Sequence, residues 1–378
     1  MLWNLLLTVL TAHLPSLDRF PPAPDSPLQA WDSADQYLLQ SLLANALQPD
    51  RPILIFDDRF GALACALAAL PVTSISDSYV SHQALAHNLA KLGLPAVQTA
   101  TPLDDWPARP QLVLIRLPKQ LSLLRHYLAR LKPLLAADTM ILAAGRDRDI
   151  PERAESLLGQ YLGHCERLLG WKKARAFLCH SDGQPAPALP APLCWPLEGS
   201  PFTLSHQANV FSRQSLDIGA RLMLANLPSG RFQRIIDLGC GNGVLALMMA
   251  SRYPDSQYTL VDESYLAVAS ASQNMTSNLP QVHAKVQANN CLDGFASASA
   301  DLVLCNPPFH QQQAVTDHIA WQMFKDSLRV LRPGGQLWIV GNRHLGYHLK
   351  LKRLFGGCQV VASDRKFVVL KAIKRTSR

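Results

Sequence analysis

Short apolar runs alternate with longer amphipathic stretches along the chain. In the second half these runs end at glycine, acid or asparagine residues and occupy 235–238, 258–261, 282–286, 302–305 and 336–340. Short runs that are apolar at most positions predict strands buried on both faces of a parallel sheet. A long helix is expected from about residue 316, ended by Pro333-Gly334-Gly335, and the runs 359–362 and 366–372 predict a closing hairpin.

The first half repeats this pattern, with predicted strands at 52–57, 74–77, 111–115 and 139–143. Landmark residues follow in the same order in both halves at growing offsets, as a duplication followed by loop insertions would give. The pairs are Asp57 and Asp237 (180 apart), Asp77 and Asp262 (185), and Arg116 and Asn306 (190). The landmarks therefore predict two related halves.

The fold class that follows is α/β, with two tandem Rossmann-like domains, the first of them degenerate. We expect the first domain at 1–180, a Pro/Ala-rich extended linker at 181–193 and the second domain at 194–378. A chain of 378 residues is long enough for about two domains. With 48% hydrophobic and 17% charged residues the composition is globular, which argues against a disordered protein.

A glycine-rich turn follows the strand that contains Asp237. It reads Gly239-Cys240-Gly241-Asn242-Gly243, and a strong helix former, 244–250, comes next. Glycines let a backbone turn tightly and approach a ligand closely, and a helix N-terminus favours a polar or anionic group. The dinucleotide fingerprint needs two residues before its last glycine, so this spacing argues against NAD.

Polar side chains also follow the next two predicted strands. Asp262 comes 25 residues after Asp237, at a strand end where an acid is placed to hold ribose hydroxyls. Asn290 follows the weak strand at 282–286 and is placed to contact an adenine edge. Each residue alone is weak support for a site, but their order after successive strands indicates a nucleoside pocket.

The tetrapeptide Asn306-Pro307-Pro308-Phe309 follows the apolar run 302–305. It therefore lies at the carboxyl end of a strand, the edge where open α/β sheets bind ligands. The asparagine side chain and the proline carbonyls are acceptors, and the phenylalanine ring is a flat apolar face. Such groups suit a planar ligand that carries an amine, although a simple turn would contain the same residues.

Together these motifs resemble the pattern of class I S-adenosylmethionine-dependent methyltransferases. Asn-Pro-Pro-Phe, in place of Asn-Pro-Pro-Tyr, is typical of enzymes that methylate the exocyclic N2 of guanine in RNA. Further stretches resemble the family of ribosomal RNA large subunit methyltransferase G, the 23S rRNA guanine-N2 enzymes, and they lie at 27–39, 171–175 and 209–221. The resemblance covers nearly the whole chain.

The resemblance implies a cofactor, a partner and roles for the site residues. The cofactor is S-adenosylmethionine, held by Asp237, Gly239, Gly241, Asp262 and Asn290, with Phe211 and Asp217 closing over it. Asn306 and the Pro307 carbonyl would accept the amine hydrogens of guanine, while Phe309, which follows Pro308, stacks on the base. The partner is ribosomal RNA, with 23S preferred, and we expect neither a membrane nor a metal.

The first domain lacks these features. Its stretch Asp57-Asp58-Arg59-Phe60-Gly61 holds one glycine where the second domain holds three, and Arg116 stands in place of Asn306. We therefore expect a non-catalytic domain, and the family resemblance implies that it recognises RNA. Its candidate RNA contacts are Lys172, Lys173 and Arg175, for which a solvated turn is an equal alternative.

Positive charge is concentrated in the second half. Residues 1–199 hold 17 basic and 18 acidic side chains, whereas residues 200–378 hold 19 and 10. The last 38 residues alone hold ten basic side chains against one acid. This distribution suits a polyanion, and Lys350, Lys352 and Arg353 are the candidate contacts; a solvated basic face is the alternative.

Cysteines and histidines give no metal motif. None of the eight cysteines forms a Cys-x-x-Cys pair, and we expect Cys179, Cys305 and Cys358 to be reduced core residues. His344 and His348 are four apart but lack the accompanying glutamate. The apolar opening 1–10 has no basic flank or cleavage site and is too short to span a bilayer, so we expect a cytoplasmic protein.

Several alternatives remain open at this point. A 16S rRNA guanine-N2 methyltransferase shares the second half of the pattern but is less alike in the first. A protein-glutamine N5 or a DNA adenine-N6 methyltransferase uses a similar pocket, although these enzymes usually have tyrosine at the position of Phe309. A ribosome-assembly module that binds cofactor without turnover would also keep these motifs.

Overall fold

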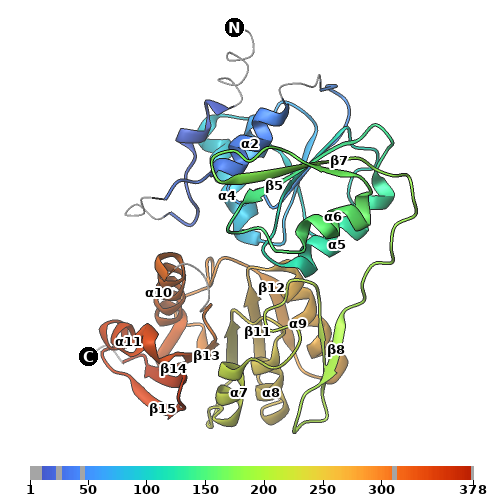
Figure 1. Ribbon diagram of the computed structural model, residues 1–378. Helices are drawn as coiled ribbons and strands as arrows, with labels where there is room; N and C mark the ends of the chain where they lie inside the picture. The colour runs from blue at the N-terminus through green and yellow to red at the C-terminus, as the bar shows by residue number, and fades with distance from the viewer. Residues whose placement is uncertain (1–10, 23–27, 43–46, 309–312, 376–378) are drawn as a thin grey trace. The chain divides into compact units, whose positions relative to one another are not determined.

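The computed structural model describes residues 11–22, 28–42, 47–308 and 313–375, without the side chains of 313–317. The chain divides into two compact units, unit 1 (Met1–Ala191) and unit 2 (Pro192–Arg378), each built on one large sheet (Figure 1). The division falls inside the proline-rich stretch 181–193. The apolar opening 1–10 and Phe309 lie outside the described residues.

Unit 1 contains a seven-stranded sheet in the order β3-β2-β1-β4-β5-β7-β6. Its strands are β1 (Ile53–Phe56), β2 (Val72–Ile75), β3 (Gln98–Ala100), β4 (Leu112–Arg116), β5 (Met140–Arg146), β6 (Cys165–Arg167) and β7 (Ala174–Cys179). Its helices are η1 (Leu14–Ser16), α2 (Ser33–Leu42), α3 (Ala62–Ala66), α4 (Tyr79–Leu92), α5 (Leu121–Leu131), η2 (Lys132–Leu134) and α6 (Ala154–Leu162). Strands β1 to β5 are parallel, and β7 is antiparallel to β5 and β6.

Unit 2 has the same strand order, β12-β11-β10-β13-β14-β16-β15. Its strands are β10 (Arg234–Leu238), β11 (Gln257–Asp262), β12 (Ala284–Ala288), β13 (Ala300–Cys305), β14 (Leu331–Asn342), β15 (Gln359–Ser363) and β16 (Phe367–Ile373). Its helices are α7 (Ile218–Ala225), α8 (Val244–Arg252), α9 (Tyr265–Asn278), α10 (Gln313–Val330), η3 (Arg343–Leu345) and α11 (Tyr347–Phe355). A separate hairpin joins β8 (Leu193–Pro196) and β9 (Thr203–His206). The predicted α/β class with two Rossmann-like sheets is confirmed.

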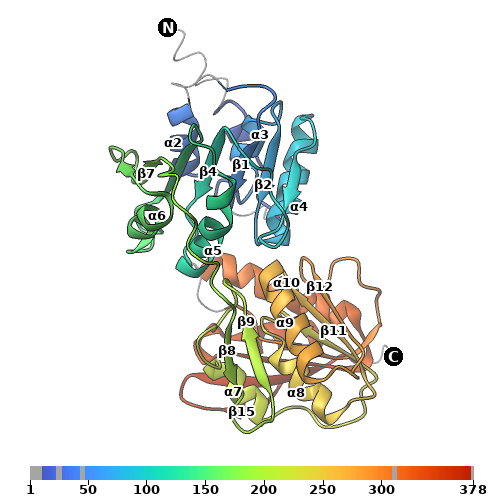
Figure 2. The ribbon, with the colours of Figure 1, turned by 90° about the vertical axis from the view of Figure 1, so that its right-hand side faces the viewer.

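Helices cover both faces of each sheet, as the apolar runs predicted. In unit 2, α7, α8 and α9 pack on one face and α10 and α11 on the other. In unit 1, α2, α3 and α4 share one apolar core, and on the opposite face Tyr127 of α5 packs on Phe56 with ring centroids 5.0 Å apart. Figure 2 shows α3 and α4 beside β1 and β2. The carboxyl ends of the parallel strands in each unit are therefore left at one edge.

The predicted end of the long helix is wrong by a few residues. Helix α10 ends at Val330 and β14 begins at once, so Pro333-Gly334-Gly335 lies within the strand. Gly334 donates its N–H to the Lys374 carbonyl at 2.8 Å, and the Lys374 N–H returns to Gly335 at 2.9 Å. A shift of pairing between Ala300 and Leu302 accommodates this stretch. Backbone pairing with a residue 40 positions away decided the boundary.

Backbone conformation corrects the first predicted correspondence between the units. Gly61 and Gly243, 182 residues apart, each precede the helix after the first strand, with φ of 84° and 77°. The same offset places Asp57 at the position of Gly239, and both have positive φ, 55° and 70°. The pairing of Asp57 with Asp237 is therefore wrong by two residues, because the backbone turn is shared and the acid is not.

The second correspondence is wrong by one residue. Ser78 and Ser264 cap the helices after the second strands. The Ser78 N–H bonds to the Ser76 side chain at 3.1 Å, and the Ser264 N–H bonds to the Asp262 side chain at 3.0 Å. Ser76, and not Asp77, therefore occupies the position of Asp262. Unit 1 has no acid at the place predicted to hold a ribose.

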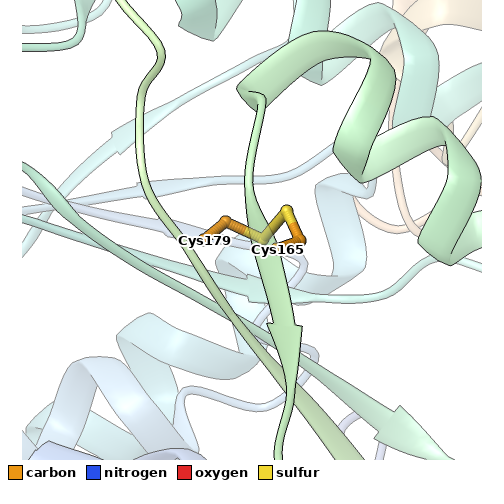
Figure 3. Close-up of a disulfide and its surroundings, with 2 residues drawn as sticks. All are labelled: Cys165 and Cys179. Carbon is orange, nitrogen blue, oxygen red and sulfur yellow. A yellow bond between two sulfur atoms is a disulfide. The ribbon is translucent and has the colours of Figure 1, made fainter.

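A disulfide corrects the prediction that the cysteines are reduced. Cys165 in β6 and Cys179 in β7 are bonded to each other (Figure 3). They lie opposite each other in the antiparallel pair, with Cα atoms 4.1 Å apart. Cys179 is buried as expected, but its partner is 14 residues away across a hairpin, which the spacing of cysteines alone did not reveal. Cys305 and Cys358 are not in a disulfide.

Buried charges fill the carboxyl edge of the sheet in unit 1. Arg116, at the end of β4, donates to both carboxylate oxygens of Asp32 at 3.0 Å, and its Nε lies 3.2 Å from Asp35. Arg146 of β5 lies 3.4 Å from Asp32. Beside them Asp58 accepts the N–H groups that open α3. Ion pairs therefore occupy the edge at which the second unit carries its glycine turn.

We expect Asp58→Asn to stabilise the protein at alkaline pH. Burial, and next the charge of Asp35, raise the pKa of Asp58 to about 7, above its ordinary value of about 4. The stability linked to the protonated carboxyl is therefore complete below about pH 4 and is lost as the pH rises through about 7. The asparagine oxygen can still accept from Leu63 and Ala64, and the variant carries no buried charge.

Urea unfolding followed by tryptophan fluorescence would measure the effect at pH 4 and pH 8. The variant should exceed wild type by on the order of 2–4 kcal/mol at the higher pH and by little at the lower one. Asp105→Asn, which changes an exposed acid of the same unit, is the control. A pH dependence as steep as that of wild type would contradict the assignment.

Candidate functional site

The glycine turn lies between β10 and α8. The N–H groups of Gly239 and Cys240 donate to the Val261 carbonyl at 2.8 and 3.0 Å, which fastens the turn to the end of β11. Gly239 and Gly241 have φ of 70° and 54°, a conformation that side-chain-bearing residues rarely adopt. A Cβ atom on Gly241 would meet nothing within 4 Å. The turn therefore leaves open space beside Gly241.

Asp237 lies beneath this turn. It is buried in β10 and accepts the N–H of Ala246 in the first turn of α8 at 3.0 Å. Burial raises the pKa of Asp237 to about 7. In this structure the contact of Asp237 is with the helix that follows the turn, so the acid fixes the position of α8 against the strand.

Asp262 ends β11 and lies beside the turn. One carboxylate oxygen accepts the N–H of Gly241 at 2.9 Å, and the other accepts the N–H of Ser264 at 3.0 Å. Burial raises the pKa of Asp262. A carboxylate has about four lone-pair positions, so it can accept these two bonds and still accept hydroxyl groups. The structure thus brings together Gly241 and Asp262, two residues that the sequence placed in one pocket.

Asn290 follows β12, and its side-chain amide is engaged at both ends. Its Nδ2 donates to Asp293 at 2.7 Å, and its Oδ1 accepts from Gln322 Nε2 at 3.2 Å. Gln322 lies on α10, and the sequence analysis did not single it out. The spacing of polar residues along a helix gave no signal for this contact, because the partner comes from a distant strand end.

Asn306 follows β13, the neighbour of β10 in the sheet. A Cβ atom built on Gly239 would lie 3.8 Å from the Asn306 carbonyl oxygen, so the turn and the tetrapeptide adjoin. The Asn306 Oδ1 atom is buried and has no hydrogen-bond partner in the described part of the chain. Pro307 is buried and Pro308 exposed. The site therefore presents one unsatisfied buried acceptor next to the glycine turn.

Asp217 and Phe211 precede the first helix of the second unit. Asp217 caps α7 by accepting the Ala220 N–H at 2.8 Å, and the same oxygen lies 3.4 Å from Asn306 Nδ2, which donates to it. Phe211 is half exposed. The structure thus brings Asp217 to the tetrapeptide, a contact that the sequence analysis did not predict.

Asn342 is a further residue that the sequence analysis missed. It ends β14, where Ile339 lies opposite Cys305. Since side chains alternate along a strand, Asn342 and Asn306 belong to the same face of the sheet. Asn342 Oδ1 is also buried without a partner among the described residues. The predicted strand ended at residue 340, which hid an asparagine at a strand end from view.

The candidate RNA contacts of unit 1 lie on a hairpin. Lys172 and Lys173 form its turn, both exposed and with positive φ of 45° and 62°. Lys172 Nζ lies 4.4 Å from the ring centroid of Trp171, and Arg175 pairs with Asp147 at 3.3 Å. The turn is thus both solvated and basic, which is compatible with an RNA contact and with a solvated turn alike.

The candidate contacts of unit 2 lie on α11. Lys352 and Arg353 are exposed, and Lys350 is half buried with Nζ 5.7 Å from the ring centroid of Tyr347. The Arg353 guanidinium lies 5.6 Å from the ring centroid of Trp321 on α10. These cations rest on aromatic rings and keep their charge at the surface.

Two further searches of the described residues bear on the partners. They hold no group of three or more His, Cys, Asp or Glu side chains arranged to bind a metal ion. Within the same residues we find no helix with the length and apolar character needed to cross a membrane.

Comparison with known proteins divides the chain at a similar place. The family described as RLMG N-terminal domain matches residues 7–183, and the family described as Methyltransferase small domain matches residues 201–371. Proteins named Ribosomal RNA large subunit methyltransferase G are similar throughout. The one from Aeromonas salmonicida is 50% identical over 97% of this chain and 98% of its own, and that from Pseudoalteromonas translucida is 48% identical over 96% of each.

One solved structure is similar over both units. It is a T. thermophilus 16S rRNA N2 methyltransferase in complex with AdoMet and guanosine, with a TM-score of 0.74 and 23% identity. The match covers 94% of this chain and 97% of that chain. At this identity the likeness shows the fold, a tandem of two Rossmann-like units.

Proposed function

Since the chain belongs to the family of ribosomal RNA large subunit methyltransferase G, we propose that it methylates the exocyclic N2 of a guanine in 23S ribosomal RNA. The observation that supports this chemistry most directly is the buried, unpartnered Oδ1 of Asn306 beside the glycine turn. A buried acceptor without a partner destabilises a fold, so a ligand donor is its natural complement.

The residues at the turn fit S-adenosylmethionine. The open space beside Gly241 admits a ligand close to the backbone, and Asp262 has remaining lone pairs for ribose hydroxyls. Asn290 and Gln322 would border the adenine, and Asp237 would support the turn from below. When bound, this cofactor supplies a sulfonium-activated methyl group, so neither a metal nor a covalent enzyme intermediate is needed.

The work of the protein is then to position the target amine. The guanine N2 lone pair is delocalised into the ring, which makes the amine a weak nucleophile. Asn306 Oδ1 and the Pro307 carbonyl would accept its two hydrogens and direct the nitrogen toward the cofactor. Phe309 would stack on the base, which must leave its helix. The proton left on nitrogen can depart to water after transfer.

RNA binding is proposed for basic surfaces on both units. Lys172, Lys173 and Arg175 would contribute from unit 1, and Lys350, Lys352 and Arg353 from unit 2. A methyltransferase acting on ribosomal RNA works in the cytoplasm, where that RNA is made. Because unit 1 lacks the glycines and the acid of unit 2, its contribution would be recognition rather than chemistry.

Incubation of the purified protein with tritiated S-adenosylmethionine and unmodified 23S or 16S rRNA tests the proposal. Digestion to nucleosides should place the label in N2-methylguanosine from 23S rRNA. Label in 16S rRNA, in N6-methyladenine or in a protein glutamine would favour one of the alternatives. Cofactor binding without any transfer would favour a silent assembly module.

We also expect the two units to differ in cofactor binding. All proposed cofactor residues lie in unit 2, whereas unit 1 has Asp57 in place of Gly239 and Ser76 in place of Asp262. Calorimetry should therefore detect S-adenosylmethionine binding to residues 192–378 and none to residues 1–191. The isolated second unit should methylate rRNA poorly. Binding by the first unit would contradict our interpretation of its edge.

A further inference from the structure

The contact between Asp217 and Asn306 determines which end of the asparagine amide faces outward. Asn306 Nδ2 donates to Asp217 Oδ2 at 3.4 Å. An ionised carboxylate can only accept hydrogen bonds, so it selects the NH₂ end of the amide. The other end, Oδ1, is then the group left without a partner among the described residues.

Asp217 is itself held in place by a helix. Its Oδ2 atom accepts the N–H of Ala220 at 2.8 Å and so caps α7. Helix α7 packs on the same sheet face as Leu302 and Leu304, the residues of β13 that precede Asn306 at alternate positions. The carboxylate is therefore fixed relative to the strand end, and with it the direction of the amide.

Unit 1 carries the same arrangement with a different outcome. Asp32 directly precedes α2, as Asp217 directly precedes α7, and it meets Arg116 at the end of β4. Arg116 donates to both Asp32 oxygens and also contacts Asp35. An arginine has only donors, so this edge offers no acceptor to a substrate amine. The aspartate is common to both units, and the asparagine opposite it is what leaves an acceptor exposed to a ligand.

We propose that Asp217 is a positioning residue, whose carboxylate holds the Asn306 amide with Oδ1 directed at the amine of the substrate. The inference rests on the proposed function, because it assumes a substrate that donates N–H groups at this position. With the amide reversed, its NH₂ would face the amine hydrogens and no hydrogen bond would form. The family resemblance assigned Asp217 to the cofactor, and this role replaces that assignment.

Asp217→Ser separates positioning from helix capping. Serine caps a helix about as well as aspartate, but its hydroxyl lies too close to the backbone to reach Asn306. We expect single-turnover methyl transfer to rRNA to fall about tenfold, with S-adenosylmethionine affinity within about twofold of wild type. Asp217→Asn keeps an oxygen for both bonds and should restore most of the rate. Ser78→Ala, which removes the cap of α4 in unit 1, should leave the rate unchanged.

The decisive measurement is the double variant Asp217→Ser with Asn306→Ala. If Asp217 acts through Asn306, the double variant should be no slower than Asn306→Ala alone, because residues that act as one unit do not contribute additively. Rate losses that multiply, a loss of cofactor affinity in Asp217→Ser, or an Asp217→Asn variant as slow as serine would each overturn the proposal. If wild type itself forms no N2-methylguanosine, the proposed function fails instead, and the same assay reports that separately.

Discussion

Replacing Asn306 by alanine should lower methyl transfer about 100-fold or more while leaving S-adenosylmethionine binding nearly unchanged. The residue is proposed to accept a hydrogen of the target amine through an oxygen that no described protein group occupies. Removing one well-aimed polar contact to a reacting group typically lowers turnover by about 10²–10³-fold. Cofactor binding should persist, since the glycine turn and Asp262 do not depend on the Asn306 side chain.

Single-turnover incorporation of labelled methyl into rRNA, with calorimetry for the cofactor, would measure both quantities. Arg116→Gln, at the corresponding strand end of unit 1, is the matched control. It should reduce stability, because Asp32 and Asp35 would then lack a buried partner, but turnover per folded molecule should hold. An Asn306→Ala enzyme with turnover close to wild type would refute the assignment of Asn306.

The sequence predicted most of what depends on local pattern. The apolar runs placed the parallel strands of both sheets, and the closing hairpin of unit 2 was predicted almost to the residue. The residues of the glycine turn also adopt the left-handed conformations that their spacing suggested. These features follow from chain-local physics, namely side-chain burial in strands and the conformational freedom of glycine.

The errors arose where contacts between distant residues decide the outcome. Asp57 and Asp77 were matched to the wrong residues because acids drew the comparison, whereas the shared features are a positive φ and a serine cap. The Cys165–Cys179 bond depends on strand register, which no cysteine spacing states. The contact of Asp217 with Asn306 spans 89 residues and forms only when α7 packs on the sheet.

The second large effect is expected in RNA binding. Changing Lys350, Lys352 and Arg353 together to glutamine removes three positive charges from α11 while keeping much of the side-chain stems. A basic side chain beside a phosphate contributes on the order of 1 kcal/mol, so RNA affinity should fall by up to about 100-fold at low salt. The slope of log affinity against log salt should become shallower by about 1 for each phosphate that is no longer neutralised. Cofactor affinity should not change.

Filter binding with 23S rRNA across a salt series would separate this from a general charge effect. The control changes three exposed arginines at the opposite, amino-terminal edge of the same sheet, Arg231, Arg234 and Arg252. Both triple variants lower the net charge equally, so a reduction in affinity confined to the α11 variant locates the contact. Equal reductions in the two variants would mean that RNA senses only the net charge of unit 2, and a flat salt response in wild type would remove phosphate contacts from the account altogether.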